Sequence, residues 1–236
     1  MVNNMINKYS LLEKKINIIF KNRLLLENIF IHRSYLNEHK KFHLPSNEKL
    51  EFLGDSVLSL STTIYLYQNY PQLNEGIYTD IKSAIVRTES LAEMARQLDL
   101  GDYLYLSKGE QLHDGRTNIN ILADCFEAFV GGIFIDKGFN TAYRFITRFL
   151  FREKVSYIVK NKLYLSPKSH LQEIVQAKYK VLPNYVIQKE NGPEHKKNFL
   201  IALYIKNKKI SLGKGMSKKE AEEEAARQAL KTYFML

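Results

Sequence analysis

Apolar residues recur at helical spacing through most of the first 160 residues of the chain. Two such series are Leu12, Ile16, Ile19 and Phe20, and Leu91, Met94, Ala95 and Leu98. Residues three and four apart share one face of a helix, so each series predicts an amphipathic helix. No run in this part alternates apolar and polar residues as a strand does, and Pro- and Gly-containing turn signals separate the series. We therefore predict an all-α domain over residues 1–160.

The pattern changes after Asn161. A helix is predicted from Lys168 to Tyr179, with Pro167 in the first turn, where proline is tolerated. Three runs rich in β-branched or aromatic residues follow at Asn184–Lys189, Phe199–Ile205 and Lys209–Leu212. A last helix is predicted to begin at Ser217, where Glu220 completes a capping box. Its small face is Ala221, Ala225, Ala226 and Ala229. The α-β-β-β-α order predicts a small α+β domain over residues 165–235, joined by a flexible tether.

Charge is distributed unevenly between these two parts. The net charge is +10, and the stretch from Leu165 to the end holds fourteen basic and seven acidic residues. The preceding 164 residues hold twenty-one basic and eighteen acidic residues. A basic C-terminal unit favours a polyanionic partner, nucleic acid before membrane, although charge that serves only solubility remains an alternative. With a single cysteine and no apolar leader or spanning segment, we expect a cytoplasmic protein that does not enter a membrane.

Two pairs of acidic residues lie within apolar helical segments. Glu51 and Asp55 are four residues apart, and Asp124 and Glu127 are three apart, so each pair shares a helix face. Buried carboxylates are costly unless they are paired or bind a cation, and no Lys or Arg lies within a helical turn of Asp124 or Glu127. Facing pairs would suit Mg²⁺, and two ions about 4 Å apart can support phosphodiester hydrolysis. The alternative is that these acids pair with distant Arg or Lys residues.

Two other residues invite a chemical role. Cys125 adjoins Asp124, but the neighbouring helical position points away from the acidic face, so we predict a buried core residue. His32 has no second histidine at metal-binding spacing, and we interpret it as structural or RNA-facing.

Several of these segments resemble the ribonuclease III family. The twelve residues from Asn47 to Leu58 (NEKLEFLGDSVL) resemble its signature, and the segments His32–Tyr35 and Leu122–Ala128 resemble two further blocks. Three later segments resemble the RNA-contacting regions of a double-stranded-RNA-binding domain: Leu171–Ile174, Gly192–Lys197 and Ser217–Ala226. The resemblance covers nearly the whole chain, in the order found in bacterial members.

The resemblance implies a double-stranded-RNA-specific endoribonuclease, active in the processing of ribosomal RNA, messenger RNA and other RNAs. Glu51, Asp55, Asp124 and Glu127 match the family's metal-binding catalytic acids. The cofactor implied is Mg²⁺, with Mn²⁺ as a substitute and no organic cofactor. The products implied carry 5′-phosphate and 3′-hydroxyl ends with short 3′ overhangs. A homodimer is also implied, with Phe52 docking into the partner subunit.

Some positions have a weaker assignment or depart from the family pattern. Glu48 and Glu75 match acids with ancillary roles. Asp80 stands where many members carry a basic or neutral residue, and Asn120 stands where serine is common. These departures put local substrate contacts in doubt more than catalysis.

Duplex RNA is recognised through its phosphates and 2′-hydroxyls, because its base edges lie in a deep, narrow groove. Lys218 and Lys219 at the start of the last helix suit phosphates, and Lys214 lies nearby. Gln172 and Gln176 are predicted to reach one minor groove, and His195 the next. The alternative is a solvated basic helix without a ligand.

Three functions compete at this point. The first is an active endoribonuclease, the second a non-catalytic protein that binds structured RNA, and the third a metal-dependent phosphohydrolase of smaller substrates. The intact acids oppose the second function, and the C-terminal RNA-binding pattern opposes the third.

Overall fold

The computed structural model describes residues 2–152, 154–192 and 197–233, with side chains from Tyr9 to Thr232 within those ranges. The chain forms two compact units, Met1–Asn161 and Lys162–Leu236. None of the helices in the described part of the chain combines the length and the apolar character that crossing a bilayer demands.

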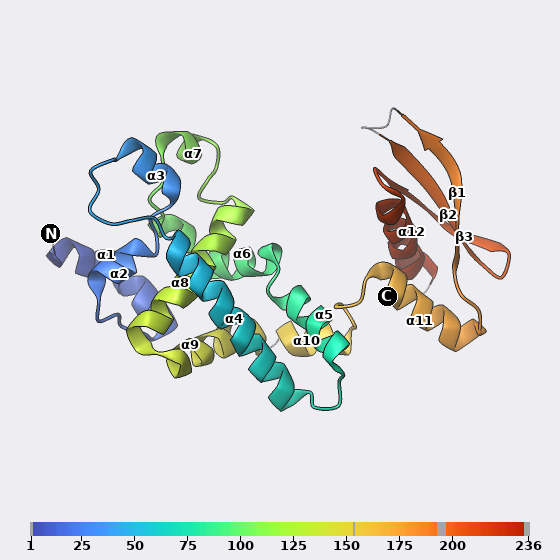
Figure 1. Cartoon of the computed structure of the whole chain (residues 1–236), viewed down its shortest axis with the longest axis horizontal. Coiled ribbons are helices and arrows are strands. Elements are labelled where there is room, and N and C mark those ends of the chain that lie inside the picture. The colour runs from blue at the N-terminus through green and yellow to red at the C-terminus, as the bar shows by residue number, and fades with distance from the viewer. Residues whose placement is uncertain (1, 153, 193–196, 234–236) are drawn as a thin grey trace. The chain divides into compact units, whose positions relative to one another are not determined.

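The first unit is helical, which confirms the predicted fold class (Figure 1). Its elements are α1 (Val2–Ile16), α2 (Arg23–Asn28), α3 (Arg33–Glu38), α4 (Glu48–Asn69), α5 (Glu75–Ile85), α6 (Thr88–Gln97), the 3₁₀ turn η1 (Leu100–Tyr103), α7 (Lys108–Leu112), α8 (Ile119–Lys137), α9 (Phe139–Ile146), the π-helical segment η2 (Thr147–Phe151) and α10 (Lys154–Lys160). The one β-type pairing among the described residues of this unit is a parallel bridge between Ile31 and Tyr105.

Helix α8 is the centre of the first unit. Phe126 and Phe129 on this helix are fully buried, and Phe129 contacts the rings of Phe20, Phe30 and Phe145. A helix that is apolar on nearly every side is stable only inside a protein, so the other helices pack around it. Helices α4 and α6 make its most extensive contacts. The polar residues of α8 are therefore exceptions that call for a physical reason.

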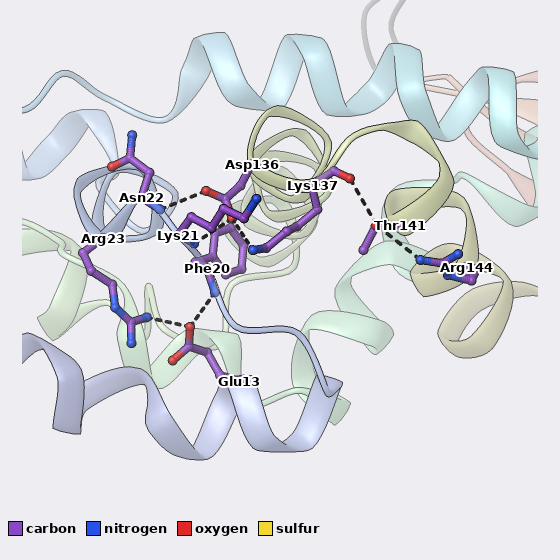
Figure 2. Close-up of polar contacts among 9 residues, drawn as sticks. All are labelled: Glu13, Phe20, Lys21, Asn22, Arg23, Asp136, Lys137, Thr141 and Arg144. Atoms are coloured by element: carbon purple, nitrogen blue, oxygen red, sulfur yellow. Dashed lines mark hydrogen bonds and ion pairs between the residues drawn. The ribbon is translucent and has the colours of Figure 1, made fainter.

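One such exception is Asp136, near the C-terminal end of α8 (Figure 2). Its carboxylate accepts hydrogen bonds from the backbone N–H groups of Lys21 and Asn22 at 2.8 and 2.9 Å. Close by, buried Glu13 accepts from the backbone N–H of Phe20 at 2.8 Å and from the Arg23 guanidinium at 2.6 Å. These contacts fix the turn between α1 and α2 against α8, and thereby orient α8 from one end.

The second unit comprises α11 (Pro167–Tyr179), β1 (Asn184–Asn191), β2 (Asn198–Ile205), β3 (Lys208–Gly215) and α12 (Lys218–Tyr233). The strands form an antiparallel sheet in the order β1-β2-β3, as the predicted α-β-β-β-α order requires (Figure 1). Lys206 and Asn207 form the β2–β3 turn with positive φ angles of 47° and 62°, a conformation that suits a two-residue hairpin loop.

Helix α12 packs closely on the sheet because its contact face carries small residues. The predicted alanine face, Ala221, Ala225, Ala226 and Ala229, is completely buried. A Cβ at Gly213 would lie 2.1 Å from the Ala221 carbonyl oxygen, so only glycine allows this approach. The third strand extends to Gly215, beyond the predicted Leu212, because packing under α12 outweighs the low strand propensity of glycine.

The start of α12 forms most of the predicted capping box. The Ser217 hydroxyl accepts from the Glu220 N–H at 3.1 Å. The Glu220 carboxylate accepts from the N–H of Met216 at 2.7 Å, one residue before the expected partner. Both contacts satisfy amide donors that lack helical partners, so this end of α12 is well defined.

Candidate active site

The site begins with a close crossing of α4 and α8 (Figure 1). A Cβ at Gly54 would lie 1.8 Å from the carbonyl oxygen of Glu127, and a Cβ at Gly131 would lie 2.2 Å from that of Leu50. Neither position has room for a side chain, so the two backbones approach as closely as glycine permits. This crossing places the acids of α4 directly beside those of α8.

Three of the predicted acids form a compact cluster. Glu51 from α4 and Asp124 and Glu127 from α8 each offer a carboxylate oxygen, and these oxygens all lie within 4.8 Å of one another. All three side chains are half-buried. A set of carboxylate oxygens at this spacing matches the donors that hard cations such as Mg²⁺ bind.

Among the acids of the cluster, Glu127 has the most strongly raised pKa. Burial raises its pKa most, followed by the charges of Asp55, Asp124 and Glu51, and the pKa reaches about 8. Burial also raises the pKa of Glu51 and of Asp124. Burial disfavours the charged form of a carboxyl, and for Glu51 and Glu127 neighbouring negative charges add to this effect.

Asp55 stands slightly apart from the other three acids. It is exposed on α4 and is not a member of the compact cluster, although it is the charged neighbour with the largest effect on Glu127. The structure thus brings three of the four predicted acids into ligand distance and places the fourth at the edge.

Pairing with distant basic residues does not explain these acids. Among the described residues, the ion pairs lie elsewhere, and Arg33 is bound at 3.6 Å to Glu48 rather than to a cluster acid. Arg33 still lowers the pKa values of Glu51 and Asp124 through its charge. This compensation is weak, because the pKa values of Glu51, Asp124 and Glu127 are all still raised. The negative charge of the cluster therefore remains largely uncompensated, as a cation site requires.

His32 lies closer to the site than the sequence indicated. Its Nδ1 accepts from the backbone N–H of Ser34 at 3.3 Å, which caps α3. His32 is the charged neighbour with the largest effect on Asp124, and this effect lowers the carboxyl pKa, although burial raises the pKa overall. Burial lowers the pKa of His32 itself. The block His32–Tyr35 gave a family signal, but no spacing rule connects residue 32 to residue 124.

The remaining candidates of the first unit have simpler positions. Cys125 is fully buried and burial raises the pKa of its thiol, which confirms the prediction of a core residue. Phe52 is 79% exposed on α4, beside the cluster but turned away from the core. Glu48 is exposed and accepts from the Ser46 hydroxyl at 2.7 Å, and Glu75 is exposed at the start of α5.

The RNA-binding candidates of the second unit lie on its surface. Gln172 and Gln176 are exposed on α11, and Lys218 and Lys219 are exposed in the first turn of α12. Lys214 is exposed on β3. His195 lies outside the described residues. The lysines add positive charge to a helix N-terminus, the end that favours anions.

Both departures from the family pattern are exposed side chains. Asp80 lies on α5, and Asn120 lies in the first turn of α8. The cap of α8 is supplied by Asn118, whose side-chain oxygen accepts from the N–H groups of Asn120 and Ile121. Asn120 is therefore not needed to begin this helix.

Comparisons with known proteins agree with this geometry. A family model described as ribonuclease-III-like matches residues 22–154, and a model of the double-stranded RNA binding motif matches residues 167–233. Ribonuclease 3 of Chloroflexus aurantiacus is 45% identical over 221 residues, covering 93% of this chain and 89% of that protein. Ribonuclease 3 of Borreliella afzelii is 47% identical over 218 residues, covering 92% and 88%.

A solved structure supports the fold of the first unit. The nuclease domain of a ribonuclease III from Campylobacter jejuni is similar with a TM-score of 0.57 and 32% identity, over 61% of this chain and 96% of that one. The catalytic-domain match, the RNA-binding-motif match and the near-full-length relatives all agree. The chain therefore belongs to the ribonuclease III family of double-stranded-RNA-specific endoribonucleases, with a helical nuclease domain followed by a double-stranded-RNA-binding domain.

Proposed function

We propose that Glu51, Asp124 and Glu127, assisted by Asp55, hold Mg²⁺ for the hydrolysis of phosphodiester bonds in duplex RNA, with Mn²⁺ able to substitute. The observation that carries this proposal is the cluster of three carboxylate oxygens within 4.8 Å of one another. The all-oxygen donor set and the raised pKa of Glu127 fit a site whose negative charge a divalent cation would neutralise. When bound, the cation supplies Lewis-acid stabilisation of phosphate charge.

The residues of the chain divide the remaining work. The close crossing at Gly54 and Gly131 holds the acids in place, so they need no large rearrangement to act together. Without a metal, the pKa of Glu127 is raised to about 8, and a cation held by the cluster would favour its deprotonated form. Water adds to phosphorus and the 3′-oxygen leaves, which gives 5′-phosphate and 3′-hydroxyl ends. No organic cofactor is needed for this hydrolysis.

The RNA contacts in this proposal come from the second unit. Lys218 and Lys219 bind phosphates at the start of α12, while Gln172 and Gln176 on α11 enter a minor groove. His195, outside the described residues, keeps its predicted role at the next groove. The substrates proposed are structured precursors of ribosomal and messenger RNA in the cytoplasm.

A homodimer completes the proposal. Phe52 is a large apolar side chain that is 79% exposed next to the acids, and such exposure fits a contact with a partner subunit. The related Campylobacter jejuni structure is described as flexible in a region involved in dimer formation. Two acid clusters in one dimer would cut the two strands with a stagger. Sedimentation should show a dimer for the native chain and a shift toward monomer for Phe52→Ala.

The test is cleavage of a duplex of about 30 base pairs, longer than the ~16 base pairs that one RNA-binding domain spans. Each strand is end-labelled, and the full chain is incubated with Mg²⁺, Mn²⁺, Ca²⁺ or chelator. Cutting of both strands with staggered ends in Mg²⁺ supports the proposal. Tight binding without cutting in every condition would instead indicate a non-catalytic RNA-binding protein. Hydrolysis of a small phosphoester that duplex RNA fails to inhibit would indicate a phosphohydrolase.

A further inference from the structure

Three arginines lie in a row on the helical segments that follow α8. Arg144 on α9, Arg148 on η2 and Arg152 directly after η2 are four residues apart and all exposed. We call these three residues the arginine ridge. Four residues of α-helix advance about 6 Å, an interval similar to that between successive phosphates of a nucleic acid strand, and Arg152 continues the row after the π-helical segment.

The ridge has little internal compensation. Arg144 reaches the Thr141 hydroxyl at 3.4 Å (Figure 2), and Arg148 reaches the carbonyl oxygen of Ile16 at 3.4 Å. Both contacts are long, and neither partner is charged. None of the three arginines forms an ion pair with a carboxylate of the described residues. Within the described part of the chain, no carboxylate neutralises their charge.

Two surface hollows meet at the ridge. One, of about 370 Å³, is lined by all three arginines together with Tyr143 and Thr147. The other, of about 680 Å³, shares Arg148 and Arg152 with the first. Among the described residues that line it, the only acid is Glu93, which Lys154 binds at 2.6 Å. The described lining of both hollows therefore carries a net positive charge.

Aromatic rings accompany the cations in the second hollow. Phe149 lies 4.8 Å from the Arg148 guanidinium, measured to the ring centroid, and Tyr157 is 62% exposed. Arginine and exposed aromatic side chains together provide surfaces on which unpaired bases stack, whereas bases inside a duplex have no free faces. A π-helical segment carries Arg148 and Phe149, and such segments occur frequently at functional sites.

We propose that the arginine ridge and its two hollows, which lie in the same compact unit as the acid cluster, bind an unpaired strand that extends from a duplex RNA substrate. The inference rests on the proposed function, because it takes RNA as the substrate. None of the ridge residues belongs to the acid cluster, so the ridge adds affinity without taking part in hydrolysis. The ridge would favour transcripts in which a duplex continues into an unpaired strand.

The test compares two RNAs bound to the full chain in Ca²⁺, one a blunt duplex and one with the same duplex and an unpaired tail. The native chain should bind the tailed RNA roughly tenfold more tightly, as one or two stacked bases provide. Arg144→Gln, Arg148→Gln and Arg152→Gln combined should abolish that preference. Because each phosphate contact of a single strand contributes about 0.7 to the salt dependence, the slope for the tailed RNA should fall by about 2.

Matched variants distinguish the effect of the ridge arginines from that of positive charge in general and from that of base stacking. Lys14→Gln, Lys21→Gln and Lys41→Gln combined remove the same charge from exposed positions of the same unit and should keep the preference for the tail. Tyr157→Ala should weaken the preference severalfold but leave the salt slope unchanged. Blunt-duplex cleavage in Mg²⁺, measured in parallel, should be the same for the ridge variant and the native chain.

Three outcomes would overturn the inference. The native chain could bind both RNAs equally, the ridge variant could retain the preference, or the lysine control could lose it to the same extent. Ridge-dependent binding of polyglutamate in preference to the RNA tail would assign the surface to an acidic protein instead. Failure of the proposed function would show separately, as a native chain that does not cut the blunt duplex.

Discussion

Two regions of α8 place carboxylates in opposite environments. Near its C-terminal end, Asp136 accepts two backbone hydrogen bonds and lies 3.2 Å from the Lys137 ammonium. Burial acts to raise the pKa of Asp136, but these contacts outweigh burial and the pKa falls. In the first half of the helix, burial and neighbouring carboxylates raise the pKa of Glu127 to about 8. One helix thus holds a satisfied acid and an unsatisfied one.

The difference distinguishes Asp136, whose contacts are structural, from Glu127, which is a candidate for function. Donors already surround Asp136, so an added cation would gain little there. Glu127 lies near the carboxylates of Asp55, Asp124 and Glu51, and this arrangement lowers the stability of the fold unless a cation binds. Perturbed acids that the fold leaves uncompensated are good candidates for function. Substitutions that remove the charge of Glu127 and of Asp136 should consequently change the stability of the metal-free protein in opposite directions.

The largest expected effect is on cleavage by Glu127→Gln. The amide keeps the shape of the side chain but removes the charge that we propose holds the cation, and a catalytic cation contributes several kcal/mol. We expect cleavage of duplex RNA in Mg²⁺ to fall by about 10³-fold, while binding to the same duplex in Ca²⁺ changes less than about threefold. Asp102→Asn, at an exposed position outside the cluster, is the matched control and should cleave normally. Unimpaired cleavage by Glu127→Gln would remove Glu127 from the site.

Gly54→Ala tests whether the close crossing of α4 and α8 brings the uncompensated acids around Glu127 together. The new methyl group would lie 1.8 Å from the Glu127 carbonyl oxygen, so α4 and α8 must separate. We expect a loss of about 1–3 kcal/mol in the free energy of unfolding, measured with denaturant, and slower cleavage by the folded protein. Gly109→Ala should change neither quantity, because the nearest atom to its Cβ is 3.9 Å away.

Asp136→Asn tests whether the hydrogen-bonded carboxylate of Asp136 has a structural role. The neutral amide weakens the hydrogen bonds from the N–H groups of Lys21 and Asn22, each a bond to a charged acceptor in the native chain. We expect the free energy of unfolding to fall by about 2 kcal/mol. Cleavage per folded molecule should be unchanged under conditions where both proteins remain folded. A large fall in cleavage with no loss of stability would contradict a structural role for Asp136.

The smallest expected effects are in the pH dependence of stability, and they have opposite signs. Without metal, the folded chain holds the Glu127 proton up to about pH 8, whereas the unfolded chain releases it near pH 4.5. The free energy of unfolding should therefore fall as pH rises between these values, and Glu127→Gln should flatten this slope. For Asp136, whose folded pKa is lowered, the contribution is lost as pH falls through the acidic range. Melting curves in chelator at several pH values measure both.

Local sequence patterns predicted most of the fold and the acids that the crossing of α4 and α8 brings together. The spacing of Glu51 and Asp55 and of Asp124 and Glu127 placed each pair on one helix face, and the alanine face of α12 indicated close packing. Contacts between distant segments were not predictable in this way. The bonds from Lys21 and Asn22 to Asp136 cross more than a hundred residues, and His32 approaches Asp124 across a similar distance.

The arginine ridge was missed for a different reason. Four-residue spacing of arginines is common on solvated helices, so it carries no signal by itself. What distinguishes Arg148 and Arg152 is the pair of hollows that they share and the nearby aromatic rings. Those features depend on tertiary structure, as does the close approach at Gly54, which the signature segment contains but does not explain.

The most direct test of the central claim is thermal melting of the native chain and of Glu127→Gln at pH 7, each in chelator and in Mg²⁺. If the acid cluster is an uncompensated cation site, Mg²⁺ will raise the melting temperature of the native chain. In chelator, Glu127→Gln will melt above the native chain and will gain little from Mg²⁺. Equal melting temperatures in chelator, with no effect of Mg²⁺ on either protein, would contradict the claim.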